Sequence, residues 1–134
     1  MTLTPRELEE IERANASGRS PVMFVHGLWL LPNSWDRWAA LFEDAGYTAI
    51  RPGWPDDPET VADAREHPEV FAGKTVGEIA DHYAEAAEAL ADRPLVIGHS
   101  FGGLLTQIVA GRGHAAASVA ISPANGFDFS SVAL

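Results

Sequence analysis

The chain has 134 residues, 46% of them hydrophobic and 21% charged, which predicts one globular domain rather than a disordered segment. A formal net charge of −10 argues against nucleic acid or an anionic membrane surface as a partner, and the absence of cysteine excludes disulfides and a thiolate nucleophile. No apolar stretch approaches the roughly 20 residues that span a bilayer, and the acidic segment 1–12 lacks the apolar core of a signal peptide, so we expect a cytoplasmic protein.

The first half of the chain alternates amphipathic segments with short apolar runs. The pattern predicts a polar helix over 5–16, a linker over 17–20 and a buried strand over 22–25. A second helix over 33–46 and a second strand over 47–50 follow. We expect Asn33 or Ser34 to cap the second of these helices and Gly46 to close it. The expected apolar face of that helix comprises Trp35, Trp38, Ala39, Leu41, Phe42 and Ala45.

The second half repeats the alternation. Thr75 and Glu78 have the spacing of a capping box and predict a helix with an apolar stripe that ends at Leu90. The remaining predicted elements are a strand, a helix and a strand, over 95–97, 100–111 and 117–121. Strands that alternate with helices predict an α/β fold with a parallel sheet, here one domain with a core over 21–123, an N-terminal helix and linker over 1–20, and a tail over 124–134.

Two motifs follow predicted strands. Gly98-His99-Ser100-Phe101-Gly102 stands between an apolar run and a helical pattern, which is the context of a nucleophile elbow. A β-carbon at Gly98 or Gly102 would collide with the neighbouring helix or strand, and the sharp turn holds Ser100 in a strained conformation with its hydroxyl exposed. The first strand ends at His26-Gly27-Leu28-Trp29, at the same edge of the sheet.

On these residues the chain resembles the α/β-hydrolase superfamily, in particular its small bacterial esterases and cofactor-free haloperoxidases. The resemblance covers about residues 21–123 and includes the Arg-Pro-Gly-Trp segment after the second strand. It implies the strand order 2-1-3-4 with helices on both faces, Ser100 as the nucleophile, and an oxyanion hole built from the backbone N–H groups of Leu28 and Phe101. It implies no cofactor and no metal.

Several neighbouring residues have competing interpretations. His26 could act as a base, but the resemblance favours a structural residue that hydrogen-bonds the oxyanion loop. We expect His99 to pack inside the elbow and Trp35 and Trp38 to lie in the core, whereas Trp29 is expected to line a substrate pocket. The carboxylates within 53–73 could bind a metal, but a solvated connection is the simpler interpretation.

The catalytic acid and base of the resembling family are not evident. After Ser100 the chain has one histidine, His114, and one side-chain carboxylate, Asp128. His114 lies roughly 20 Å from Ser100 by helical rise, and no histidine follows Asp128. The family members are about twice as long, with acid and histidine in later loops, so the chain reads as the N-terminal half of a serine hydrolase.

Two functions remain open at this point. One is hydrolysis of a small carboxyl ester or related acyl substrate by Ser100, since haloalkane dehalogenases and soluble epoxide hydrolases have aspartate at the elbow and dienelactone hydrolases have cysteine. The other is a catalytically inactive fragment or binding module. In either case the fourth strand would form an exposed edge, where Val119, Ala120 and Ile121 lack covering helices, and we expect self-association through it.

Overall fold

The computed structural model describes residues 2–27, 30–55, 62 and 75–124. The helices are α1 (Pro5–Ser17), α2 (Asp36–Asp44), α4 (Val76–Ala89) and α5 (Phe101–Gly111), with a 3₁₀ turn, η1 (Pro32–Trp35), directly before α2. The strands are β1 (Pro21–Val25), β2 (Thr48–Ile50), β3 (Leu95–His99) and β4 (Ala117–Ile121). No helix in these described ranges is long and apolar enough to cross a membrane.

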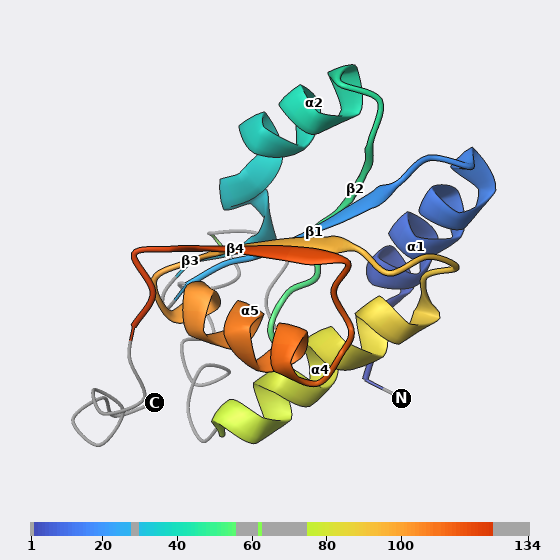
Figure 1. Cartoon of the computed structure of the whole chain (residues 1–134). Helices are drawn as coiled ribbons and strands as arrows, with labels where there is room; N and C mark the ends of the chain where they lie inside the picture. Colours follow the sequence, from blue (N-terminus) through green and yellow to red (C-terminus); the bar gives the residue numbers. More distant parts are fainter. Residues whose placement is uncertain (1, 28–29, 56–61, 63–74, 125–134) are drawn as a thin grey trace.

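The four strands form one parallel sheet in the order β2-β1-β3-β4, which confirms the predicted fold and strand order. β1 and β3 pair from Val22 with Leu95 to Val25 with Gly98, so the strands that precede the two motifs are neighbours. α2 covers one face of the sheet and α4 and α5 cover the other, while α1 lies beside β2 and α4 (Figure 1). The carboxyl ends of β1 and β3 therefore meet at one edge, where both motifs begin.

Each face of the sheet has its own apolar core. All five residues of β1 are buried, which explains its unbroken apolar run, since a central parallel strand is covered on both faces. The core under α2 comprises Val22, Phe24, Trp35, Ala39, Ala49 and Ile97. The larger core, beneath α4 and α5, includes Met23, Val25, Tyr83, Val96, Phe101 and Leu105. Each large side chain buried in this way contributes about 1.5–3 kcal/mol of hydrophobic stabilisation.

Capping boxes start two of the helices. Thr75 accepts a hydrogen bond from the backbone N–H of Glu78, whose carboxylate accepts one from the N–H of Thr75, which confirms the predicted helix start. The same reciprocal pair, Thr4 with Glu7, starts α1. These contacts satisfy backbone donors that the first helical turn leaves without an intrahelical partner.

The prediction that Asn33 or Ser34 caps α2 is wrong. This segment forms η1, in which the Ser34 hydroxyl donates to the carbonyl of Leu31 at 2.7 Å. α2 begins only at Asp36, and its N-cap residue makes no side-chain capping bond. The hydroxyl thus stabilises the tight turn that precedes the helix instead of the helix itself.

The apolar face of α2 is narrower than its sequence predicted. Trp35 and Ala39 are buried, but Trp38 is 44% exposed and Leu41 is 64% exposed. Positions 35, 39 and 42 lie on the side of the helix that faces the sheet. Positions 38 and 41 are rotated away from that side, toward the exposed surface of the helix. The expectation that Trp38 belongs to the core is therefore wrong, although its ring makes an edge contact with Trp35 at 5.5 Å.

The outer edge of β2 is closed by side chains rather than by a strand. The backbone groups of Ala49 and Arg51 point away from β1, and all four of them are hydrogen-bonded to charged side chains at 2.8–3.4 Å. The two carboxylates accept from the N–H groups and the two guanidinium groups donate to the carbonyl oxygens. The four side chains are Arg6, Glu10 and Arg13 of α1 and Glu43 of α2. A further strand cannot pair there unless these contacts break.

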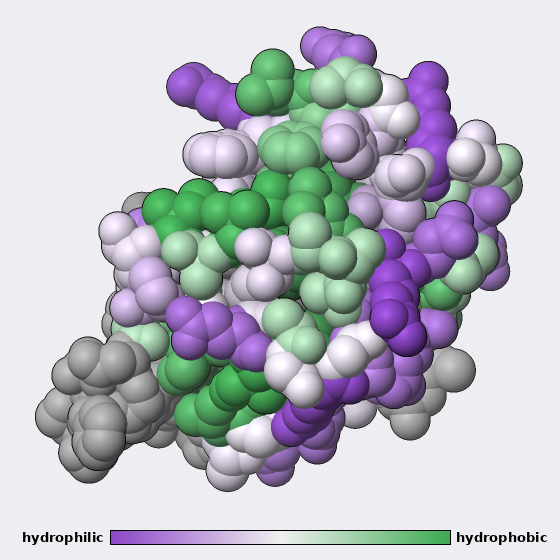
Figure 2. All heavy atoms as spheres, viewed as in Figure 1, coloured by the Kyte–Doolittle hydropathy of each residue, from purple (hydrophilic) through white to green (hydrophobic). Residues whose placement is uncertain are grey.

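The opposite edge, β4, is open. Residues 117–119 are exposed, and Val119 is 46% exposed. Val119 and Ile121 lie on the face of α2, as their pairing with Ile97 and His99 indicates. Ile121 is half-buried against the core under α2, whereas Val119 remains exposed. Ala120 pairs with Gly98, on the side where α5 packs along β3 and β4, so the expected loss of cover on that face is wrong. Figure 2 shows hydrophobic side chains at the surface between α2 and α5.

Candidate active site

Ser100 occupies the turn between β3 and α5 in a strained conformation. Its φ of 58° and ψ of −120° lie outside the regions that non-glycine residues favour, and its side chain does not cap α5. The turn is held by the N–H of Ser100, which donates to the carbonyl of Ile121 at 3.0 Å, and by the N–H of Ala124, which donates to the carbonyl of Ser100 at 3.0 Å. Ser100 is exposed, so its hydroxyl is accessible at the N-terminal end of a helix, where the helix dipole favours negative charge.

Ser100 shares its positive φ with one other described non-glycine residue. Ser122, directly after β4, has a φ of 43°. Ser122 lies between the two residues whose backbone groups hold the elbow, Ile121 and Ala124. The strain therefore occurs on both sides of one contact, at the point where the chain leaving β4 meets the turn after β3.

Glycine is required on both sides of the elbow, as the sequence predicts. A β-carbon on Gly98 would lie 2.2 Å from the carbonyl oxygen of Gly102, and one on Gly102 would lie 2.1 Å from the carbonyl oxygen of Val25. Both distances are far below van der Waals contact and involve backbone atoms that cannot rotate away. The two glycines thus allow α5 to pack directly against β3 and β1.

The His-Gly motif lies directly against the elbow. A β-carbon on Gly27 would be 3.5 Å from the β-carbon of Ser100 and 3.8 Å from the backbone nitrogen of Phe101. Leu28 and Trp29, the predicted oxyanion donor and the predicted pocket residue, lie outside the described residues. The structure therefore places Gly27, Ser100 and Phe101 together, at the position where the sequence predicts the oxyanion hole.

His26 is buried, with 1% of its surface exposed. Its Nδ1 lies 2.9 Å from the carbonyl oxygen of Gly27, and because a carbonyl can only accept, this nitrogen carries the hydrogen. The ring stacks on Trp54 with centroids 5.5 Å apart and an interplanar angle of 13°. A bond to the loop that follows β1 is the contact expected of a structural His26 rather than of a base.

This arrangement matches a known family. The model of the alpha/beta hydrolase family matches residues 22–134. The chain belongs to this family. No curated protein matches the sequence.

Solved structures of similar fold include enzymes of different activities. A monoacylglycerol lipase of Paleococcus ferrophilus is 20% identical with a TM-score of 0.62, over 82% of this chain and 44% of the lipase. Polyneuridine aldehyde esterase is 19% identical with a TM-score of 0.60, over 78% of this chain and 40% of the esterase. Epoxide hydrolase A of Mycobacterium thermoresistibile is 22% identical with a TM-score of 0.57, over 75% of this chain and 31% of the hydrolase. At these identities the likeness concerns the fold, and this chain spans less than half the length of each enzyme.

The remaining histidines of this alpha/beta hydrolase have other surroundings. His99 is exposed at the end of β3, so the expectation that it packs inside the elbow is wrong. The strand alternation directs it away from the buried side of its neighbour Gly98. His114 lies beyond the far end of α5, where its Nε2 is 3.4 Å from a carboxylate oxygen of Glu88. Asp128, like His67, falls outside the described residues.

A small apolar cavity opens beside the elbow. It has a volume of about 270 Å³ and lies between the end of β3, η1 and α2. Its lining residues are His26, Gly27, Leu30, Ser34, Trp35, Trp38, His99 and Ile121. A larger cavity of about 480 Å³ lies at the β2 edge, lined mainly by charged side chains of α1, away from Ser100. Of these two cavities, the smaller one lies beside the elbow and the larger one does not.

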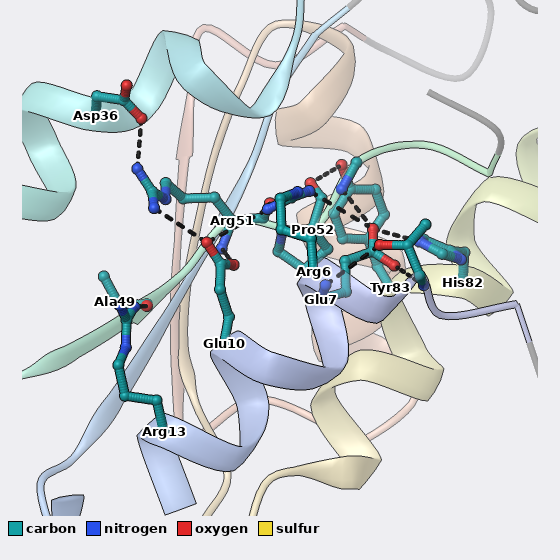
Figure 3. A network of polar contacts seen from close by, with 12 residues as sticks. Arg6, Glu7, Glu10, Arg13, Asp36, Ala49, Arg51, Pro52, His82 and Tyr83 are labelled. Atoms are coloured by element: carbon teal, nitrogen blue, oxygen red, sulfur yellow. Dashed lines mark hydrogen bonds and ion pairs between the residues drawn. The ribbon is translucent and has the colours of Figure 1, made fainter. Parts of the chain in front are cut away.

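A buried carboxylate and a buried histidine beneath the site are absent from the sequence-based expectations. Glu7 Oε1 lies 3.0 Å from His82 Nε2 and accepts a hydrogen bond from the N–H of Gly53 at 2.8 Å (Figure 3). Burial raises the pKa of Glu7, but the hydrogen bonds from His82, Thr4 and Gly53 outweigh it and hold the pKa below its ordinary 4.5. The signal available in the sequence was a histidine, His82, within the otherwise apolar stripe of α4.

Proposed function

We propose that this chain carries the nucleophilic half of a serine hydrolase that acts on a small carboxyl ester or related acyl substrate, with Ser100 as the nucleophile. The observation that carries the proposal is the strained, exposed Ser100 at the head of α5, flanked by two glycines that no larger residue could replace. A structural turn would not require an exposed serine in this conformation. The lipase and the esterase of similar fold support the same class of reaction, whereas the serine disfavours the reaction of the epoxide hydrolase.

In the proposed reaction the Ser100 oxygen attacks the carbonyl carbon of the ester while a base accepts the hydroxyl proton. The carbonyl oxygen becomes negatively charged, and the N–H groups of Phe101 and Leu28 would hydrogen-bond it, with the α5 dipole adding to the stabilisation. The proton passes to the departing alcohol, and water then attacks the acyl-serine to release the acid. Each donor to the oxyanion is worth about 3 kcal/mol of barrier height.

We propose that the base and the acid lie outside these 134 residues, either in a longer product of the same gene or in another chain. Three described histidines already have partners: His26 bonds the loop after β1, His82 bonds Glu7, and His114 faces Glu88. The fourth, His99, lines the cavity beside the elbow and makes no hydrogen bond to Ser100 in the part of the chain that the structure describes. The closeness of Gly27 to Ser100 and to the backbone nitrogen of Phe101 supports an oxyanion hole beside this serine.

The first experiment compares hydrolysis of p-nitrophenyl acetate by the 134-residue chain and by Ser100→Ala. We expect weak hydrolysis, since serine hydrolases without triad partners retain about 10³- to 10⁴-fold catalysis over water and here the pocket is also incomplete. Ser100→Ala should reduce that rate measurably, and labelling by a fluorophosphonate should be slow, because the serine is not activated. Equal rates for the two chains would support the second candidate function, a catalytically inactive fragment or binding module.

A further inference from the structure

Trp54 contacts both segments that contribute to the candidate oxyanion hole. Its ring stacks on His26, and its centroid is 5.1 Å from that of Phe101 at an angle of 46°. Trp54 is only 3% exposed, so it supports these rings from beneath and does not face a substrate. His26 directly precedes Gly27, and Phe101 directly follows Ser100. One buried ring therefore contacts both strand exits that meet at the nucleophile.

The loop that carries Trp54 is anchored at its two preceding residues. The N–H of Gly53 donates to Glu7 Oε1 at 2.8 Å, and the hydroxyl of Tyr83 donates to the carbonyl of Pro52 at 3.1 Å (Figure 3). Glu7 comes from α1 and Tyr83 from α4, and both side chains are buried. The loop after β2 is thus fixed from two helices that belong to neither motif.

We propose that Trp54 is a positioning residue of the catalytic centre. It holds His26 and Phe101 so that the N–H groups of the loop after β1 and of Phe101 converge on one point, and Glu7 fixes the position of Trp54. The chemical part of this inference rests on the proposed function. Preorganised donors act only at a defined position, and a displacement of about 1 Å can cost on the order of 100-fold in rate. A rigid, buried ring is suited to fix the segments that follow β1 and β3 within a fraction of this distance.

The test begins with nuclear magnetic resonance, which does not depend on activity. In Trp54→Leu we expect the ring protons of His26 to move downfield as the stacked indole is lost, together with shifts of the Gly27 and Phe101 amides. Trp54→Phe, which keeps an aromatic face, should restore most of these shifts. Phe42→Leu is the matched control, because Phe42 packs on Phe24 with ring centroids 5.6 Å apart in the other core and does not line the cavity beside the elbow.

A second variant keeps the proposal falsifiable if Trp54→Leu fails to fold. Glu7→Gln leaves the indole in place but weakens the anchor of Gly53, and it should shift the His26 and Phe101 resonances in the same direction by a smaller amount. The proposal is overturned if Trp54→Leu, or Glu7→Gln where the former is unfolded, disturbs these residues no more than Phe42→Leu does.

The activity arm separates this inference from the proposed function. Where hydrolysis of p-nitrophenyl acetate depends on Ser100, Trp54→Leu should lower kcat about tenfold with little change in KM, and Trp54→Phe should recover most of it. An unchanged kcat in that case would overturn the positioning role. If the wild-type rate equals that of Ser100→Ala, the proposed function fails, while the resonance shifts still decide whether Trp54 holds the two segments.

Discussion

At the scale of single residues, the elbow is a strained turn that its surroundings maintain. A serine with a positive φ costs about 1–3 kcal/mol relative to a relaxed backbone. The bonds from Ser100 to Ile121 and from Ala124 to Ser100 join the turn to the end of β4, which limits its relaxation. Glycine at 98 and 102 then lets the backbones pack at distances that would exclude any side chain. The strain thus lies at Ser100, whose side chain is exposed, and at Ser122 across the contact with the end of β4.

Glu7 makes the stability of the fold dependent on pH. Because its pKa is lower in the folded chain than the ordinary 4.5, its ionised form stabilises the fold fully above that value, and the stabilisation is lost as the pH falls below it. We expect the melting temperature of the wild-type chain to drop as the pH falls below 4.5. Glu7→Gln should cost about 3 kcal/mol at pH 7 and show a flatter pH dependence over the same interval.

The control for this prediction is Glu12→Gln, which removes an exposed carboxylate from the same helix. Thermal melts monitored by circular dichroism, at intervals of half a pH unit, would compare the three chains. A wild-type pH dependence that is unchanged in Glu7→Gln but reduced in Glu12→Gln would contradict the assignment to the buried carboxylate.

At the scale of secondary-structure elements, the two edges of the sheet differ in kind. The edge of β2 has all its outward backbone groups bonded to side chains of α1 and α2, whereas β4 has no charged residue and no proline between Ala117 and Ile121. Exposed edge strands usually avoid pairing by charge, proline or cover. The described part of β4 has none of these protections on its outer side.

We therefore predict that the 134-residue chain self-associates through β4 and, since β2 is closed, stops at a two-fold dimer. Size-exclusion chromatography with light scattering should give a dimer or a concentration-dependent average mass. Val119→Lys should shift the chain to monomer, because two lysines would face each other across the new pairing. Leu41→Lys is the matched control, since Leu41 is an exposed apolar residue on α2, away from β4. A cooperatively melting wild-type monomer would contradict the prediction.

At the scale of the whole molecule, local sequence patterns predict the sheet and the elbow but not the contacts between distant segments. The alternation of apolar runs with helical patterns, and the glycines around Ser100, are properties of neighbouring residues, and both predictions are confirmed. The exposure of Trp38 depends on which side of α2 packs against the sheet. The place of Trp54 depends on how the loop after β2 folds between two other strands. Neither dependence is encoded in the spacing of nearby residues.

The location of α1 has a consequence for where this protein can be shortened. The family match begins at Val22, so a chain trimmed to that boundary would keep the elbow and lose Arg6, Glu10 and Arg13. Both margins of the sheet would then offer free backbone groups, and β2 of one copy could join β4 of the next. Such head-to-tail joining leaves a free edge at each end of the assembly, so that copies continue to add unless a ring closes. We expect the trimmed chain to grow into filaments, visible by electron microscopy, under conditions in which the 134-residue chain forms none.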